Sequence, residues 1–434
     1  MSEGKLEGIT KIAVKGFKSI AEECEIDIRP LTILAGANSS GKSSIMQPLL
    51  MLKQTLEVPY DPGALLIDGP NVRFTLVEQF LSKLTDEKKA NCFQIQIETC
   101  DSIITRLLRE VFRKGPNRIE IAEMATETKS AQPIYGYPKH LKLFPGMPPE
   151  EIKAQLNQNM IPEDYNVVKR LRCFLHLESQ DSYLSANSTF NFESNILNIV
   201  HLPGLRGNLE RIYKLISTGP RYPGTFDNYA ASVIHKWQEA KDERLKTLGD
   251  ALHILGLTGK VSAQKVGDVG IEVQVGRLPH GRTGETDMVN IADVGLGVSQ
   301  VLPVLAALIV AEPGQLVYLE QPELHLHPRA QVALARVLAD AAKRGVRVVA
   351  ETHSSLLLLG IQTLVAEGDL SPELVKLHWF TRRKDGVTEV SSVDLDEAGT
   401  YGEWPEDFDD VDLNVQSRFL DAVDRVRFGK EEAS

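Results

Sequence analysis

Apolar and polar positions alternate most regularly near the N-terminus of the chain. Residues 9–20 (ITKIAVKGFKSI) and 25–28 have the spacing that predicts two strands, and an apolar run beginning at Leu31 predicts a third. Beyond this run, apolar residues recur at the spacing of one helical face, at Ile45, Leu49, Leu52 and Leu56. The pattern therefore predicts strands followed by an amphipathic helix, and the PYDPG turn at residues 59–63 ends this first lobe.

The last third of the chain alternates between short apolar runs and helical segments. Residues 316–320 (LVYLE) and 346–350 (VRVVA) have the continuous apolar character of buried parallel strands. A helix is predicted between them over 329–343, and another before them over 301–310. This alternation predicts a mostly parallel sheet whose carboxyl ends carry the functional residues.

The region between these two parts has a different texture. We expect strands at 93–98, 118–122 and 268–275, and helices at 150–159 and within 227–257. No sustained heptad pattern predicts a long coiled coil. The predicted fold class is α/β, with two lobes around a mostly parallel sheet and a mixed α+β insertion. The predicted domains are an N-terminal lobe over 1–60, the insertion over 61–285 and a C-terminal lobe over 286–434.

A phosphate-binding loop joins the predicted third strand to the helix that follows it. Residues 36–43 read GANSSGKS, which fits the pattern G-x-x-x-x-G-K-[ST] in the required strand–loop–helix setting. Glycines let consecutive N–H groups point inward at the positive end of the helix, where a triphosphate binds. We expect Lys42 to reach the β- and γ-phosphates and Ser43 to hold Mg²⁺. The residues expected to contact the nucleotide here are Gly36, Asn38, Ser39, Ser40, Gly41, Lys42, Ser43 and Ser44.

Composition narrows the cellular setting. The chain has 42% hydrophobic and 25% charged residues, as ordinary globular proteins do. Its longest apolar stretch, residues 302–311, is too short to span a bilayer, and residues 1–8 lack the features of a signal peptide. The four cysteines are scattered without a C-x-x-C pair, which suits a reducing compartment. These observations predict a cytoplasmic protein without a membrane partner.

The net charge of −11 means that the surface as a whole does not attract polyanions. Local basic clusters nevertheless occur around residues 106–118, 169–172 and 382–384. We interpret each as a solvated face, while a nucleic-acid groove built from one or two of them stays open.

Three further motifs follow in a recognisable order: GLGVSQ at 295–300, LVYLEQPELHLHP at 316–328 and VVAETHS at 348–354. Together with IAVKGFKSI and the phosphate loop, they make the chain resemble ABC-type ATPases of the SMC/RecF group. The similarity is closest to stand-alone RecF-like ATPases found with OLD-type (overcoming lysogenization defect) nucleases, many of which also end in a segment like GEWPEDF at 402–408.

The resemblance implies roles for individual residues. The nucleotide is ATP, with Mg²⁺. The signature motif, which caps the γ-phosphate bound by the other subunit, falls on Gly295, Gly297, Ser299 and Gln300, where small residues and an exposed hydroxyl suit this role. Glu320 takes the place of the Walker B acid, which holds the Mg²⁺ water shell, and His353 that of the switch histidine at the γ-phosphate.

One position departs from the pattern of the group. Many ABC ATPases have a second acid directly after the Walker B acid, whereas this chain has Gln321. An amide can orient water but cannot take a proton, so we expect slow hydrolysis or another base. Glu323 and Glu351 are the candidates, and Glu351 is favoured.

Histidines and an arginine near these motifs have two readings each. A metal pair is conceivable at His325 and His327, but the resemblance implies a structural turn near the dimer interface. Arg206, in the segment HLPGLRGN, either reaches a phosphate or belongs to a surface loop, and both readings stay open.

The predicted function is that of an ATPase which forms a head-to-tail homodimer or higher homo-oligomer around ATP. Too few residues follow His353 for a nuclease domain of the OLD type, so an effector, a nuclease or toxin, is expected as a separate chain of an anti-phage defence system. Two alternatives stay open: a RecF-like DNA repair ATPase, and a nucleotide-gated scaffold that does not hydrolyse ATP. A DNA or RNA partner is left open.

Overall fold

The computed structural model describes residues 7–84, 88–101, 104–116, 118–130, 139–158, 165–178, 185–186, 189–206, 210–277 and 287–402. The GEWPEDF segment lies outside these residues except for Gly402. Among the helices described, none is long and apolar enough to cross a membrane.

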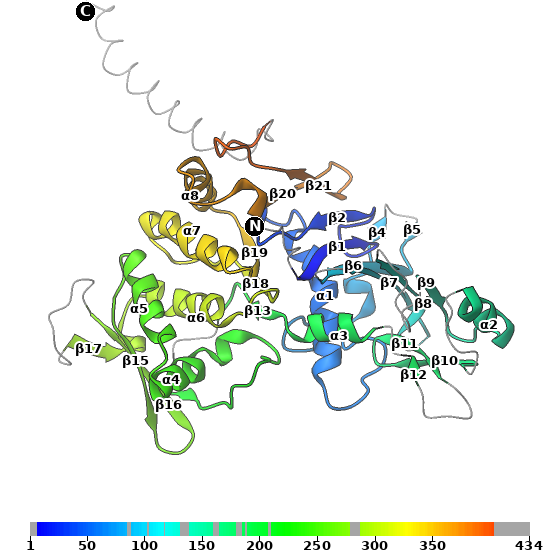
Figure 1. Ribbon diagram of the computed structural model, residues 1–434, viewed down its shortest axis with the longest axis horizontal. Coiled ribbons are helices and arrows are strands. Elements are labelled where there is room, and N and C mark those ends of the chain that lie inside the picture. Colours follow the sequence, from blue (N-terminus) through cyan, green and yellow to red (C-terminus); the bar gives the residue numbers. More distant parts are fainter. Residues whose placement is uncertain are drawn as a thin grey trace, which may run out of the picture.

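A mostly parallel sheet forms the centre of the described structure (Figure 1). Its strand order is β13-β18-β19-β3-β20-β21, in which neighbours from β13 to β20 run parallel and β21 is antiparallel. The strands are β3 (Leu31–Gly36), β13 (Val200–Leu202), β18 (Leu316–Glu320), β19 (Arg347–Thr352), β20 (Val375–Arg382) and β21 (Thr388–Val393). The predicted α/β class is thus confirmed, and the strands predicted at 316–320 and 346–350 are found almost where expected.

Helices cover both faces of this sheet. Helices α6 (Leu296–Val310), α7 (Pro328–Lys343) and α8 (Ser355–Ala366) lie on one side, and α1 (Lys42–Glu57) lies on the other (Figure 1). Strand β3 contributes to both cores, because Ile33 packs with the first group of helices and Leu34 packs with α1. The helix predicted from the spacing of Ile45 and Leu49 is therefore confirmed.

A second sheet, antiparallel, packs beyond α1. Its order among the described strands is β2-β1-β6-β7-β8-β9. These strands are β1 (Gly8–Lys15), β2 (Cys24–Asp27), β6 (Cys92–Cys100), β7 (Thr105–Lys114), β8 (Ile119–Lys129) and β9 (His140–Leu143). The alternation at residues 93–98 and 118–122 correctly predicted β6 and the start of β8, whereas β7 was not predicted.

The remaining elements lie at the two ends of the molecule in Figure 1 or in connections. The helices and 3₁₀ turns are α2 (Pro149–Gln158), α3 (Phe190–Leu197), α4 (Ala230–Ala240), α5 (Arg244–Ile254), η1 (Val77–Gln79), η2 (Phe226–Asn228), η4 (Ile291–Asp293) and η5 (Pro372–Leu374). The strands are β4 (Lys83–Leu84), β5 (Lys88–Lys89), β10 (Val167–Leu171), β11 (Phe174–Glu178), β12 (Ser185–Ala186), β14 (Tyr213–Lys214), β15 (Val261–Val266), β16 (Gly270–Gly276) and β17 (Met288–Asn290). The two helices predicted within 227–257 are α4 and α5, and Trp237 is buried on α4 as expected.

Residues between 61 and 285 contribute to both large sheets. Strands β6 to β9 extend the sheet begun by β1, and β13 forms one edge of the central sheet. Within the proposed insertion, β6 pairs with β1 of the N-terminal lobe and β13 pairs with β18 of the C-terminal lobe. The domain boundaries at 60 and 285 stay a prediction.

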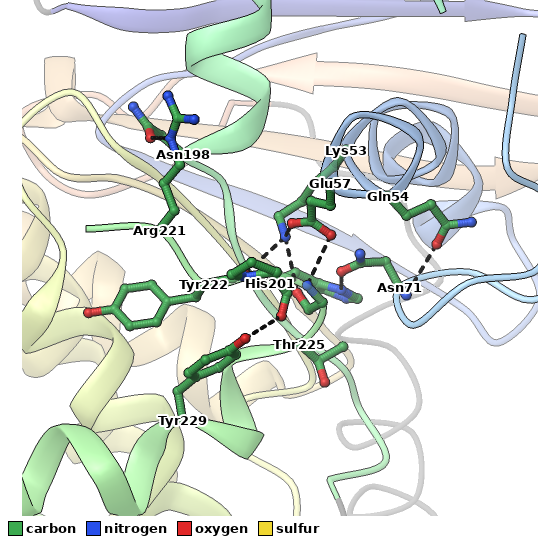
Figure 2. A network of polar contacts seen from close by, with 12 residues as sticks. Lys53, Gln54, Glu57, Asn71, Asn198, His201, Arg221, Tyr222, Thr225 and Tyr229 are labelled. Atoms are coloured by element: carbon green, nitrogen blue, oxygen red, sulfur yellow. Dashed lines mark hydrogen bonds and ion pairs between the residues drawn. The ribbon is translucent and has the colours of Figure 1, made fainter. Parts of the chain in front are cut away.

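The C-terminal half of α1 is anchored by a buried ion pair. Lys53 pairs with Glu57 and also donates to the backbone carbonyls of Tyr222 (3.2 Å) and Gly224 (3.1 Å). Glu57 in turn accepts from the N–H of Gly224 at 3.0 Å, and Figure 2 shows the Lys53 and Glu57 side chains together on α1. The buried charges are thus paired and hydrogen-bonded, which fixes the helix after the phosphate loop against the segment that follows β13.

A buried carboxyl group in the antiparallel sheet lacks such partners. Glu110 on β7 is 0% exposed, and neither of its carboxyl oxygens has a hydrogen-bond partner among the described residues. Burial raises the pKa of Glu110 well above its usual value, so the folded chain holds it protonated. Because the unfolded chain releases this proton above its ordinary pKa of about 4.3, the group lowers folding stability as pH rises from there toward the folded-state pKa.

Replacing Glu110 with methionine should therefore raise the free energy of unfolding at pH 7 by about 1–3 kcal/mol. Denaturant unfolding at pH 5 and pH 8 measures this, and the gain should be larger at pH 8. Glu120→Gln, at a solvated ion pair with Arg113 on the same sheet, is the control and should change stability by less than about 0.5 kcal/mol. A loss of stability in Glu110→Met would show that the carboxyl group has a stabilising partner.

Candidate active site

The phosphate loop bends sharply between β3 and α1. Gly36 and Gly41 have φ values of 142° and 106°, and Ser39 has a φ of 60°. A Cβ atom on Gly41 would lie 2.4 Å from the hydroxyl oxygen of Thr388, and one on Gly36 would lie 2.3 Å from the carbonyl oxygen of Phe380. Both positions therefore need glycine, as the phosphate-loop pattern predicts.

Lys42 begins α1 and its side chain turns back over the loop. Its Nζ donates to the carbonyl oxygens of Gly36 (2.9 Å) and Ala37 (2.8 Å) and lies 3.5 Å from Nδ1 of His353. The residue is 3% exposed, and burial lowers the pKa of its ammonium group. The cation is held in the cradle that the loop forms.

A cleft of about 790 Å³ opens over this loop. Residues 38–44 line it from below, and Gln321, Glu351 and His353 line it from the carboxyl ends of the neighbouring strands. Basic side chains on its walls are Lys18, Lys83, Arg382 and Arg383. The structure therefore brings residues 38–44 of the predicted phosphate loop together with Gln321, Glu351 and His353 in one cavity, whose lining omits Gly36, Glu320 and the predicted signature residues.

Two glutamates meet at the carboxyl edge of the central sheet. Glu320 is the last residue of β18, and Glu351 is its register partner on β19. Strand β19 lies between β18 and β3, the strand that leads into the phosphate loop. One carboxylate oxygen of Glu351 accepts from the Ser43 hydroxyl at 2.9 Å, and the other accepts from the buried Tyr318 hydroxyl at 2.9 Å. The carboxylate nearest to the predicted Mg²⁺ ligand Ser43 is thus Glu351, and the metal role predicted for Glu320 stays a prediction.

The two carboxyl groups have pKa values shifted in opposite directions. Burial raises the pKa of Glu351, and the neighbouring charge of Glu320 raises it further. Burial also acts to raise the pKa of Glu320, but the contact with His201, the N–H of Gly204 and the charge of Arg206 together outweigh it and the net pKa is lowered. Glu351 is therefore the member of the pair that protonates first as pH falls.

Glu320 is held by the segment that follows β13. Its carboxylate lies 3.2 Å from Nε2 of His201 and accepts from the N–H of Gly204 at 3.1 Å. The other ring nitrogen of His201 lies 3.0 Å from the Asn71 side-chain oxygen, and Figure 2 shows these two side chains facing each other. The role of His201 was not predicted, because 119 residues separate it from Glu320 and no motif links them. Only its place in the HLPGLRGN segment drew notice.

Glu323 fixes the backbone around the predicted switch histidine. One carboxylate oxygen accepts from the Thr352 hydroxyl at 2.6 Å and from the N–H of His353 at 3.1 Å. The His353 ring is half-buried, and burial together with the nearby Lys42 lowers its pKa. At neutral pH this imidazole is therefore uncharged beside the Lys42 ammonium.

The turn after β18 places Gln321 and two histidines. Gln321 has a φ of 45° and His325 a φ of 65°, both in the left-handed region that non-glycine residues seldom adopt. The N–H of Gln321 donates to the carbonyl oxygen of Glu351 at 2.8 Å. His327 caps α7, and its Nδ1 accepts from the N–H of Arg329. No group of three or more potential metal-ligating side chains occurs in the part of the chain described. That search does not cover a pair, so the structural reading of His325 and His327 stays a prediction.

The predicted signature residues begin α6. Gly295 is the N-cap, and Gly297 lies in the first turn. Ser299 is 8% exposed, and its hydroxyl donates to the carbonyl oxygen of Leu296 at 3.0 Å. The expectation of an exposed hydroxyl at Ser299 is therefore wrong in the single subunit, because the hydroxyl donates to a carbonyl oxygen of its own helix.

Acidic neighbours neutralise much of the predicted basic clusters. Ion pairs with carboxylates are formed by Arg106, Arg109, Arg113, Lys114, Lys169, Arg170 and Arg383. Arg382 instead donates to the carbonyl oxygens of Gly386 and Ser39 at the edge of the cleft. These contacts agree with paired faces, which are solvated except at Arg106, since that residue is only 6% exposed.

A phosphate loop after a central strand, flanked by the acidic ends of two parallel strands, defines an ATPase of the P-loop class in its ABC-type arrangement. Residues 8–244 match the family described as "AAA ATPase domain", and residues 148–359 match the family described as "AAA domain, putative AbiEii toxin, Type IV TA system". The first match spans more than half of the chain, so the chain belongs to the AAA ATPase domain family. The predicted resemblance to ABC-type ATPases of the SMC/RecF group is confirmed at this level.

Solved structures similar to the chain include three SMC head domains. An SMC head bound to the C-winged helix domain of ScpA is 16% identical, covers 90% of this chain and 99% of its own, and has a TM-score of 0.49. The SMC head domain from Thermotoga maritima is 11% identical, with coverages of 89% and 100% and a TM-score of 0.42. An SMC head with an extended coiled coil, bound to the C-terminal domain of ScpA derived from Pyrococcus furiosus, is 13% identical, with coverages of 90% and 97% and a TM-score of 0.45. All three scores lie below 0.5, so the assignment rests on the family match and the site. No curated protein matches the chain.

Proposed function

We propose that this ATPase binds Mg·ATP in the cleft over the phosphate loop, dimerises head to tail around the nucleotide and turns it over slowly. In the cell it would act as the sensor or scaffold of an anti-phage defence system that controls a separate effector. The observation that carries the nucleotide site is the convergence of Lys42, Ser43 and Glu351 in one cleft at the carboxyl edge of the central sheet.

The oxygen donors of this cleft suit Mg²⁺. Ser43 and Glu351 offer a hydroxyl and a carboxylate whose oxygens lie 2.9 Å apart, and Glu320 is the next carboxylate in register. Because the described residues include no larger ligand cluster, the ion would be held jointly by these groups and the phosphates, as is usual for Mg²⁺. A Mg²⁺ ion bound there would neutralise negative charge on the phosphates. This geometry favours Glu351 as the carboxylate of the metal site over its predicted role as general base.

Dimerisation is inferred from the separation of the signature residues from the cleft. Gly297, Ser299 and Gln300 do not line the cleft of their own chain, so a contact with nucleotide would come from a second copy. Nucleotide then stabilises the dimer by mass action, and hydrolysis removes that stabilisation.

Slow turnover is inferred from Gln321. Its side chain lines the cleft, where an amide can orient the attacking water but cannot accept its proton. Replacing Gln321 with glutamate should therefore raise the single-turnover rate of phosphate release by at least about tenfold.

The test of the proposed function is single-turnover phosphate release measured alongside sedimentation, with and without Mg·ATP, for the wild type and Gln321→Glu. An ATP-dependent dimer with slow release in the wild type and faster release in the variant supports the proposal. A wild type that assembles without any release is a nucleotide-gated scaffold. A wild type that stays monomeric with saturating ATP contradicts the head-to-tail dimer.

The defence role rests on the family description, which names a toxin of a type IV TA system, and on the similarity to RecF-like ATPases found with OLD-type nucleases. The paired basic clusters favour a protein effector over a nucleic-acid groove. Phage plaque counts on cells carrying the gene with its neighbours, compared with a Lys42→Ala version, test this role. Equal plaque counts, or ATPase activity stimulated by DNA, would instead support the repair alternative.

A further inference from the structure

Arg206 joins two elements that carry different parts of the predicted machinery. It follows β13 and is 7% exposed. One terminal nitrogen donates to the carbonyl oxygen of Gln300 in α6 at 3.1 Å. The other donates to the carbonyl oxygens of Glu320 (2.9 Å) and Gln321 (3.1 Å) at the end of β18. A single guanidinium group thus bridges the signature helix and the Walker B turn.

The bridge is made to backbone rather than to side chains. Within the described residues, no carboxylate forms an ion pair with Arg206, and its Nε has no hydrogen-bond partner. Burial lowers the pKa of Arg206 to about 10, while the charges of Glu323, Asp227 and Glu320 act on it from a distance. Such a cation depends on the positions of three carbonyl groups, and the planar fork of arginine holds them at a fixed separation.

The Walker B end of the bridge belongs to the nucleotide cleft. Gln321 lines the cleft, and its N–H donates to the carbonyl oxygen of Glu351, whose carboxylate contacts Ser43. Gly204, two residues before Arg206, donates to the Glu320 carboxylate. A shift of the β18 turn when Mg·ATP binds would therefore move the Arg206 guanidinium and its other partner.

The signature end belongs to the helix that would face the partner subunit. Gln300 follows Gly297 and Ser299 on α6, and none of these three residues lines the cleft of its own chain. We propose that Arg206 is a positioning residue that couples nucleotide binding in one subunit to the placement of the signature helix, and through it to the nucleotide of the partner subunit. This inference rests on the proposed head-to-tail dimer. It also corrects both earlier readings of Arg206, because the side chain is buried and its terminal nitrogens are engaged away from the phosphate loop.

The test compares Arg206→Met and Arg206→Lys with the wild type. Arg211→Met is the matched control, because Arg211 also joins this segment to the start of the signature region, through Asp293, but at an exposed ion pair. The first measurement is amide hydrogen exchange across residues 296–310 of the full chain, with and without Mg·ATP, at concentrations too low for dimerisation. The second is ATP affinity, and the third is the ATP-dependent dimer dissociation constant from sedimentation.

In the wild type, and in Arg211→Met, Mg·ATP should change exchange at the start of α6. In Arg206→Met we expect ATP affinity within about threefold of the wild type, no exchange response in α6 and a dimer at least about tenfold weaker. Arg206→Lys keeps the charge without the fork and should give a partial response, which keeps the test decisive if the methionine variant unfolds. A merely structural role would lower thermal stability and leave the exchange response intact.

The inference is overturned if Mg·ATP changes hydrogen exchange in α6 as much in both Arg206 variants as in the wild type. It is also overturned if the Arg206 variants lose ATP affinity by the same factor as they lose dimerisation. A wild type that binds ATP with an α6 response but never dimerises contradicts the proposed function and not the coupling through Arg206.

Discussion

Replacing Lys42 with alanine is expected to weaken ATP binding by at least about a hundredfold, which is the loss of two charge-assisted contacts to phosphate oxygens. The ammonium group already lies in the cradle of the loop, bonded to the carbonyl oxygens of Gly36 and Ala37. Titration calorimetry with Mg·ATP measures the change. Because Lys42 also donates to two loop carbonyl oxygens, thermal unfolding without nucleotide is measured alongside to check that the variant is folded.

The control for this variant is Lys384→Ala, which removes the same charge from an exposed position beside the cleft. It should bind ATP with an affinity within about twofold of the wild type, since an exposed charge contributes little at physiological salt. If Lys42→Ala binds as tightly as this control, the cleft is not the nucleotide site.

Replacing Glu351 with glutamine is expected to lower the single-turnover rate by about a hundredfold and to raise the Mg²⁺ concentration needed for half-maximal turnover by more than tenfold. The amide keeps the shape of the side chain and loses the charge that faces Ser43. Phosphate release across a Mg²⁺ titration measures both effects. Glu22→Gln, on the cleft wall and paired with Arg383, is the control and should leave the Mg²⁺ requirement unchanged. A slow variant with an unchanged Mg²⁺ requirement would restore Glu351 to the role of general base.

The same variant has a pH signature. Because burial and Glu320 raise the pKa of Glu351, the carboxylate forms only above the ordinary carboxyl range of about 4–5. Protons therefore compete with Mg²⁺ for Glu351, so the Mg²⁺ concentration needed for half-maximal turnover should rise as pH falls, and this acidic limb should vanish in Glu351→Gln. A limb that persists in the variant would belong to another group.

Local pattern was sufficient for the elements that dominate the active site. The phosphate loop and α1 were predictable because an apolar strand, a glycine pattern and a helical apolar face follow one another in the 27 residues from the start of β3 to the end of α1. Strand β18 and helix α7 were predictable because a buried strand and a proline-started helix have distinct compositions. The three-residue strand β13 was not, since so short a run has no periodicity of its own and pairs only through β18.

The site could be predicted only in part, because several of its contacts join segments that are far apart in the chain. Glu351 lies against Ser43 because β19 is placed between β18 and β3, and sheet order is not encoded in either motif. The contacts of His201 with Glu320 and of Arg206 with α6 join residues far apart in the chain, and a single sequence contains no signal that pairs them. The exposure of Ser299 was predicted wrongly because the motif does not indicate that its hydroxyl donates to the carbonyl oxygen of Leu296 in the first turn of α6.

The position of β3 also dictates the order in which the protein is completed during synthesis. Leu31 pairs with Val348 on one side and Val375 on the other, so the strand that enters the phosphate loop has no partner in the central sheet until β19 is synthesised and lacks its second partner until β20 is. At roughly 5–20 residues per second, this wait is on the order of half a minute. Over that interval the apolar strand Leu31–Gly36 lacks the neighbours that bury it in the folded chain. The central sheet, and with it the edge that carries the cleft over the phosphate loop, is therefore completed only when the last strands arrive.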